Sequence, residues 1–171
     1  MPASDLERIF AALAASGARY LVVGGVAVVL HGHPRFTADL DLAIALDPAN
    51  VEAVLAALER LGYGPRAPLA MRAFADPEQR ADWERTKGMT VFSLWSAELP
   101  GTELDLFVSE PFPFEAAWAR RLRVELSGAV VEVVSLEDLI EMKRRAGRPR
   151  DMEDVRELEA IARELRGRGG D

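Results

Sequence analysis

The stretch Thr37–Ala45 reads TADLDLAIA, and it decides what kind of fold the chain can form. Apolar side chains recur at every second position, at Leu40, Leu42 and Ile44. This alternation predicts a β-strand with one face in a core. Asp39 and Asp41 then project together from the other face, because residues two apart on a strand point the same way. Two adjacent like charges repel each other, so this face needs an explanation.

Length and composition limit the classes of protein that the chain can belong to. Its 171 residues predict one domain, with a core over about 19–134 and a helical C-terminal part over about 135–167. With no cysteine, disulfides and thiolate metal sites are excluded. The first residues lack the pattern of a signal peptide, and no apolar run is long enough to span a membrane. We therefore expect a cytoplasmic protein with no membrane partner.

Helix and strand signals follow one another along the whole chain. Expected helices lie at residues 4–16, 26–33, 48–61, 136–145 and 149–166, with a helical piece near 77–85 inside a loop over 62–87. Expected strands lie at 19–25, 37–45, 89–95 and 103–109, followed by a hairpin over 121–134 that turns at Ser127 and Gly128. Ser4 and Glu7 suggest a capping box for the first helix. This order predicts an α+β fold: a mixed sheet of about five strands, helices mainly on one side, and C-terminal helices appended.

A third carboxylate is expected to meet the first two. In the later strand ELDLFV, Asp105 shares a face with Glu103 and Phe107. If this strand lies beside the first, Asp105 reaches Asp39 and Asp41. A divalent cation would offset the repulsion among three converging carboxylates. One or two Mg²⁺ ions suit phosphoryl or nucleotidyl transfer. The alternative is a plain exposed sheet face.

Gly24 and Gly25 stand where the first strand passes into a short helix. Glycines at such a junction let the backbone approach a phosphate group, and the helix start offers free N–H donors. A tight turn would need the same residues. Their combination with the aspartate pair on the next strand favours the phosphate-binding interpretation.

These motifs together resemble a known superfamily. VGG, followed by DLDL and later by LDLF, is similar to the signature of the DNA-polymerase-β-like nucleotidyltransferases. The longer strings GGVAVVLHGHPRFTADLDLAI and EDLIEMKRRAGRPRDMEDV resemble small bacterial nucleotidyltransferases related to abortive-infection and toxin–antitoxin proteins. The resemblance covers about residues 19–160 and implies the nucleotidyltransferase fold.

The resemblance also implies roles for individual residues. Asp39, Asp41 and Asp105 would bind Mg²⁺ and carry catalysis, with Asp105 helping to deprotonate an acceptor hydroxyl. Nucleotide binding would fall to Gly24, Gly25, Arg35, Thr37 and Lys143. Some family members have serine where this chain has Gly25, so a hydroxyl contact to phosphate is missing here. Glu103 could replace or supplement Asp105.

Lys143 stands out on its own helix. It continues the apolar stripe of Leu136, Leu139 and Ile140, and a lysine on an inward face needs a reason. Either it lies near the nucleotide or the acidic cluster, or its chain extends along the end of the stripe to solvent. Downstream, Arg148, Asp151 and Asp154 match the tail pattern of the family, with a role that is structural or supporting.

The expected activity is Mg²⁺-dependent transfer of a nucleoside monophosphate from a nucleoside triphosphate to an acceptor hydroxyl, with release of pyrophosphate. The acceptor stays open between the end of an RNA such as tRNA, a protein side chain and a small molecule such as an antibiotic, and a cognate partner protein is also open. The net charge of −7 weakens the RNA option, whereas the basic run Lys143–Arg150 keeps it. A non-catalytic nucleotide- or partner-binding module and a metal-dependent phosphohydrolase are the alternatives.

Overall fold

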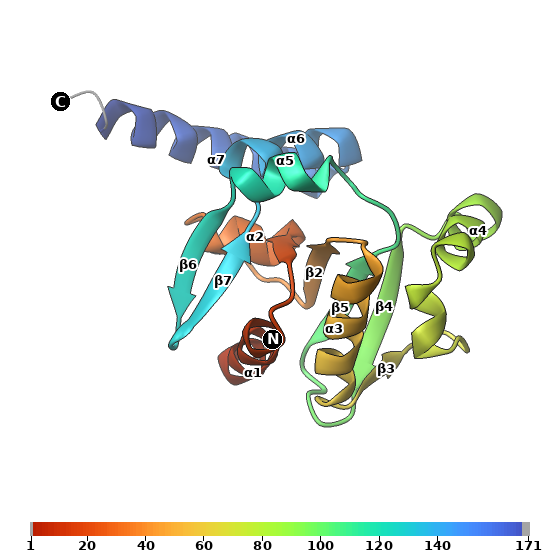
Figure 1. Cartoon of the computed structure of the whole chain (residues 1–171). Helices are drawn as coiled ribbons and strands as arrows, with labels where there is room; N and C mark the ends of the chain where they lie inside the picture. Colours follow the sequence, from red (N-terminus) through yellow and green to blue (C-terminus); the bar gives the residue numbers. More distant parts are fainter. Residues whose placement is uncertain (1, 169–171) are drawn as a thin grey trace.

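A computed structural model describes residues 2–168, which form a mixed sheet with helices around it (Figure 1). The strands are β1 Tyr20–Val23, β2 Asp39–Ile44, β3 Tyr63–Pro65, β4 Val91–Ser96, β5 Glu103–Phe107, β6 Leu122–Leu126 and β7 Ala129–Val133. They lie in the order β3-β4-β5-β2-β1-β7-β6. The β2–β5 and β1–β7 pairs are parallel and the others antiparallel, so the expected mixed sheet is confirmed.

The described sheet has seven strands, so the prediction of about five was too low. The unexpected strand is β3, which falls in the segment predicted as a loop. It has only three residues and ends at Pro65, so it shows no alternating pattern. An edge position tolerates a proline because one side of the strand needs no donor. The hairpin of β6 and β7 turns as expected at Ser127 and Gly128, both of which have positive φ.

The helices largely follow their sequence signals. They are α1 Ala3–Ala15, α2 Gly24–Leu30, α3 Pro48–Glu59, α4 Pro77–Lys87, α5 Phe114–Ala119, α6 Leu136–Ala146 and α7 Pro149–Arg168, with a 3₁₀ turn at Met71–Ala75. Asp47 caps α3 by accepting from the amide of Asn50 at 3.0 Å. Ser135 caps α6 by accepting from the amide of Asp138 at 3.1 Å.

Two expectations about the helices were wrong. The capping box of Ser4 and Glu7 does not form, because α1 already begins at Ala3 and Pro2 precedes it without a side-chain cap. Glu7 instead accepts a hydrogen bond from the hydroxyl of Ser127 at 2.5 Å. The short helix α5 was not predicted, since it follows a segment rich in proline and has only six residues.

The C-terminal helices cover one end of the sheet. α1 packs on β7 and on α3, while α2 lies against β2 and contacts α6. In Figure 1, α5, α6 and α7 gather above α2, and α4 lies at the far end beyond β4. No helix within residues 2–168 has the length and apolar character needed to cross a membrane.

The alternation in β2 and β5 is realised as expected. The four leucines of these strands, Leu40, Leu42, Leu104 and Leu106, are fully buried in the core. The intervening acidic residues are exposed or half-buried on the opposite face. Burying the leucines anchors the two strands side by side, and this fixes where the carboxylates lie.

Candidate active site

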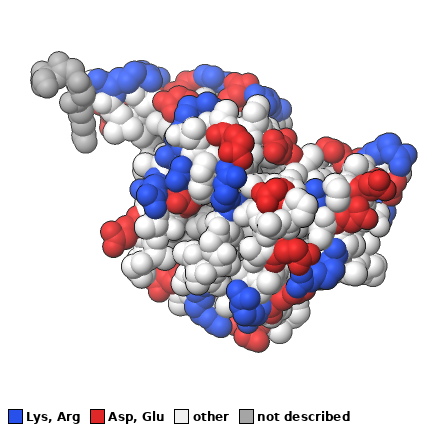
Figure 2. Space-filling model, viewed as in Figure 1, with Lys and Arg blue, Asp and Glu red and all other residues white. Residues whose placement is uncertain are grey.

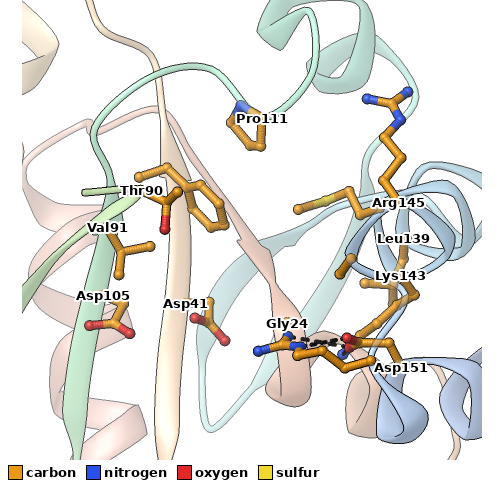
Figure 3. Close-up of a pocket in the computed structure, with 14 residues that line it drawn as sticks. Gly24, Asp41, Thr90, Val91, Asp105, Pro111, Leu139, Lys143, Arg145 and Asp151 are labelled. Carbon is orange, nitrogen blue, oxygen red and sulfur yellow. Dashed lines mark hydrogen bonds and ion pairs between the residues drawn. The ribbon is translucent and has the colours of Figure 1, made fainter. Parts of the chain in front are cut away.

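The strand register brings the carboxylates together. In the parallel pair of β2 and β5, Asp41 is the direct partner of Asp105, and Asp39 is the partner of Glu103. The expected meeting of Asp105 with Asp41 is therefore found, whereas Asp39 lies beside Glu103 and not beside Asp105. Figure 3 shows Asp41 and Asp105 on neighbouring strands, both facing the same cavity.

The environment of this pair disfavours two negative charges. Burial, followed by the nearby charges of Asp105 and Asp39, raises the pKa of Asp41 to about 6, against the opposing effects of Lys143 and the Gly25 backbone. Burial also raises the pKa of Asp105, against a hydrogen bond with Ser93. A bound cation would relieve both carboxylates.

The donor set fits Mg²⁺ through two carboxylates rather than through a closed cage. In the part of the chain that the structure describes, no three His, Cys, Asp or Glu side chains are arranged so that they could hold a metal ion. Asp39 is exposed at the start of β2, and Glu103 pairs with Arg66. Mg²⁺ commonly takes one or two carboxylates and completes its shell with water and substrate phosphate oxygens. Asp41 and Asp105 can supply such a pair, with Asp39 one row away.

Gly24 is required beside Asp41. Its φ is +62°, and a Cβ at this position would overlap the Asp41 carboxylate, lying 2.6 Å from its Cγ. Both the backbone conformation and the space favour glycine. The glycine therefore lets the strand-to-helix junction lie directly against the acidic pair.

Gly25 makes a similar close approach to the loop before β2. A Cβ there would lie 2.7 Å from Nη2 of Arg35 and 2.9 Å from Cβ of Thr37. The Thr37 hydroxyl donates to the carbonyl oxygen of Asp39 at 3.3 Å. Some members of the superfamily that the motifs resemble have serine in place of Gly25. In this chain a serine side chain would not fit there unless the loop shifted.

Lys143 points inward, as its place in the apolar stripe predicts, and only 7% of it is exposed. Its Nζ lies 3.0 Å from Oδ1 of Asp151 and 2.9 Å from Oδ2 of Asp154. Both acids belong to α7 and are 2% exposed. The sequence could have revealed these partners only through their spacing of three residues, which places them on one face of a helix.

The same two acids hold two arginines. Nε of Arg35 lies 3.4 Å from Oδ1 of Asp154, and Nε of Arg148 lies 2.6 Å from Oδ2 of Asp151. Burial alone would raise the pKa of Asp151, but hydrogen bonds from Arg148 and Lys143 hold it below its usual value. We call Arg35, Lys143, Arg148, Asp151 and Asp154 the charge cluster, in which Lys143 and the two acids are buried and Arg148 is exposed. It joins three separate segments of the chain.

Two hollows meet at the carboxylates. Both are lined by Gly24, Asp41, Asp105, Lys143, Arg148 and Asp151. The glycine-side pocket, of about 350 Å³, adds the polar side chains of Arg35, Thr37, Asp39 and Arg150, together with Gly25, Phe36 and Ala38. The β4-side pocket, of about 450 Å³, adds mainly apolar groups, including Val91, Phe107, Pro111, Leu139 and Met142 (Figure 3). All eight candidate residues from the sequence line the joined hollows.

The apolar wall of the β4-side pocket is the part of the site that the sequence analysis missed. A signal for it exists in the strands, because Val91 and Phe107 are register partners two residues along from Ser93 and Asp105. They therefore share the carboxylate face of the sheet. Pro111 and Met142 come from other elements and carry no such signal.

The basic run Lys143–Arg150 is largely engaged within the molecule. Arg144 pairs with Glu159 and Arg145 with Glu141, in addition to the pairs of Lys143 and Arg148 described above. Arg150 donates to the carbonyl oxygen of Phe36. On the face seen in Figure 2, acidic and basic side chains of the described residues are interspersed without a broad area of one sign.

Solved structures share this fold at low sequence identity. ANT(2″)-Ia, solved in complex with adenylyl-2″-tobramycin, aligns at a TM-score of 0.58 and 17% identity, over 98% of each chain. The lincosamide antibiotic adenylyltransferase LnuA, bound to lincomycin, gives 0.61 and 17%, over 92% of this chain and 96% of the other. An antigenic nucleotidyltransferase-like protein from Paracoccidioides brasiliensis gives 0.56 and 20%, over 92% and 74%.

No curated protein matches the chain in sequence. A family model does match, and it spans nearly the whole chain, from residue 4 to residue 165. Its description agrees with the superfamily that the glycine and aspartate motifs resemble. The chain therefore belongs to the family described as Nucleotidyltransferase of unknown function (DUF6036), a family of nucleotidyl-transferring enzymes.

Proposed function

We propose that the chain transfers a nucleoside monophosphate from a nucleoside triphosphate to an acceptor hydroxyl, releasing pyrophosphate, with Mg²⁺ held by Asp41 and Asp105 and with Asp39 one row away. The observation that carries the proposal is the register pair of Asp41 and Asp105 at the junction of two pockets. A reaction between two substrates needs such a shared point. Membership of a nucleotidyltransferase family supports the same chemistry.

The triphosphate binds in the glycine-side pocket. Gly24 and Gly25 bring bare backbone to the edge of this pocket, and Arg35, Thr37 and Lys143 line it. The charge cluster contains three cations and two acids, which leaves one positive charge in excess. That excess, together with the nearby Arg150, suits the phosphates of a nucleotide.

The transfer step uses the carboxylate face. When bound, Mg²⁺ neutralises charge on the phosphates and on the acids that hold it. The acceptor oxygen forms a bond to the α-phosphorus, and the bond from that phosphorus to the bridging oxygen of the β-phosphate breaks, so the electron pair leaves with pyrophosphate. Asp105 takes the proton of the acceptor hydroxyl, because its carboxylate lies where the two pockets meet.

A small molecule is the acceptor that the site supports best. ANT(2″)-Ia and LnuA, which share the fold, are described with antibiotics bound, one of them as an adenylyl product. The basic run Lys143–Arg150, the main argument for RNA, is engaged in internal pairs. A pocket of about 450 Å³ also lies within the range of roughly 300–1,000 Å³ typical of small-molecule sites.

The test is incubation of the full chain with each of the four α-labelled nucleoside triphosphates, Mg²⁺ and a total cell extract. Label should move into the small-molecule fraction; label in RNA or protein would instead identify those acceptors. Asp41→Asn should abolish transfer. Glu125→Gln, at an exposed acid of β6 that lines neither pocket, is the matched control and should leave it unchanged. Nucleotide binding without any label transfer would favour the non-catalytic alternative.

A further inference from the structure

The β4-side pocket lies where an acceptor must approach. In nucleotidyl transfer, the attacking and leaving oxygens lie roughly in line on opposite sides of the phosphorus. If pyrophosphate leaves on the side of Gly24 and Gly25, the hydroxyl must enter from the side of Asp105. Across the sheet, that direction leads from β2 through β5 to β4, which is where this pocket opens. This step rests on the proposed function.

The walls of this pocket are apolar from three directions. The sheet contributes the register partners Val91 and Phe107, directly beyond the Asp105 row. Helix α6 contributes Leu139 and Met142, and Pro111 closes the far side. Figure 3 shows Val91, Pro111 and Leu139 around the space above the two aspartates. Contact of such walls with an apolar body favours binding, whereas burying a charged group against them costs binding free energy.

The charges that line the pocket also limit which charge an acceptor can carry. Among the described residues that line it, the acids are Asp41, Asp105 and Asp151, and the last is paired with Lys143 and Arg148. The remaining charges of the lining are cations, including Arg145 at the rim, where it pairs with Glu141. Apart from the two reaction carboxylates, this lining offers no uncommitted acid to an amino group. A polycationic acceptor would therefore meet like charge without a counter-ion.

We propose that the β4-side pocket binds the acceptor, and that the acceptor is a small hydroxyl compound with an apolar body that is neutral or anionic. The hydroxyl points at Asp105, and the body lies against Val91, Phe107 and Met142. A polyamine sugar or cyclitol is excluded by the same walls. The pocket thus sets the substrate class within the proposed reaction.

One test measures binding and needs no turnover. The fluorescent probe 1-anilinonaphthalene-8-sulfonate is small, apolar and anionic, so it should bind the wild-type chain. Met142→Glu places a carboxylate in the wall and should weaken binding at least about tenfold. Met142→Leu keeps the wall apolar and should bind as the wild type does. Leu165→Glu, on an exposed position of α7 outside the pocket, is the charge control and should have no effect.

Equal binding by Met142→Glu and Leu165→Glu, with Met142→Leu folded as the wild type, would overturn the assignment of the pocket. A second test identifies the product: labelled small molecules from the extract reaction should be retained by a reversed-phase resin and not by a cation-exchange resin at neutral pH. Retention on the cation exchanger would overturn the substrate class. Absence of any labelled product, with the probe results intact, would contradict the proposed function while supporting the apolar pocket.

Discussion

Asp41 of β2 lies directly beside Asp105 of β5 in a parallel strand pair, on the face of the sheet that the leucines leave free. Gly24 touches the Asp41 carboxylate with no side chain of its own in between. Burial and like charge make this arrangement costly in the absence of a cation. The two carboxylates thus carry an electrostatic cost at the place where the two pockets meet. Such a cost is typical of sites organised for binding and chemistry rather than for stability.

The pH dependence of stability should report this cost. The pKa of Asp41 is about 6 in the folded chain and 3.8 as an ordinary value, so the folded state binds more protons between these pH values. The metal-free free energy of unfolding should therefore fall as pH rises from about 4 to about 6. Asp41→Asn lacks this loss and should be more stable than the wild type by up to about 3 kcal/mol at pH 7.5. Urea unfolding in EDTA at several pH values measures the difference.

Added Mg²⁺ with a non-hydrolysable nucleotide should reverse that order, because a ligand that binds only the folded state stabilises it. The wild type should then gain stability at pH 7.5 and Asp41→Asn should gain little. If Asp41→Asn unfolds more easily than the wild type in EDTA, the carboxylate has a structural role instead.

Gly24→Ala should cost more than its backbone conformation alone explains. The new Cβ would sit at φ +62° and also overlap the Asp41 carboxylate. Gly88 has nearly the same φ, +61°, with open space around it, so Gly88→Ala measures the backbone strain by itself. We expect Gly24→Ala to be less stable than Gly88→Ala by about 1–3 kcal/mol and to lose transfer activity. Equal losses of unfolding free energy in the two variants would show that the contact with Asp41 is not close.

Lys143 should be essential to the fold of the C-terminal helices as well as to nucleotide binding. Lys143→Met removes a cation from the two buried acids of α7, which leaves a buried charge uncompensated and should cost about 3 kcal/mol or more. Arg144→Met, which breaks an exposed pair with Glu159 on the same helix, should cost less than about 1 kcal/mol. Chemical unfolding compares the two.

The double variant Lys143→Met with Asp154→Leu should recover part of the stability, because it removes one of the unpaired acids. It should not recover nucleotide affinity, which can be followed by equilibrium dialysis with a labelled nucleotide. Full recovery of that affinity would assign Lys143 a purely structural role.

The sequence was sufficient for those parts of the site that follow from local periodicity. Alternation in two strands placed Asp41 and Asp105 on one face, and the helical stripe placed Lys143 inward. The pairing of Lys143 with Asp151 and Asp154 was not predicted, because their spacing shows only that the two acids share a helix face, and the packing of α7 on α6 is a tertiary contact. The strand β3 was missed because three residues ending in proline carry no period. The apolar wall was missed because Val91, Pro111 and Met142 come together only in the folded chain.

The most direct test of the account follows where the α- and γ-phosphate labels of a nucleoside triphosphate go in the presence of Mg²⁺. The wild type is compared with Asp105→Asn. With the wild type and the enzyme-free small-molecule filtrate of a cell extract, label should move from the α-position to an acceptor, and γ-label should appear only in pyrophosphate. With Asp105→Asn, folded as the wild type by circular dichroism, neither should occur. Undiminished α-label transfer by Asp105→Asn, or γ-label released as free phosphate by the wild type, would contradict the claim that this carboxylate pair carries nucleotidyl transfer.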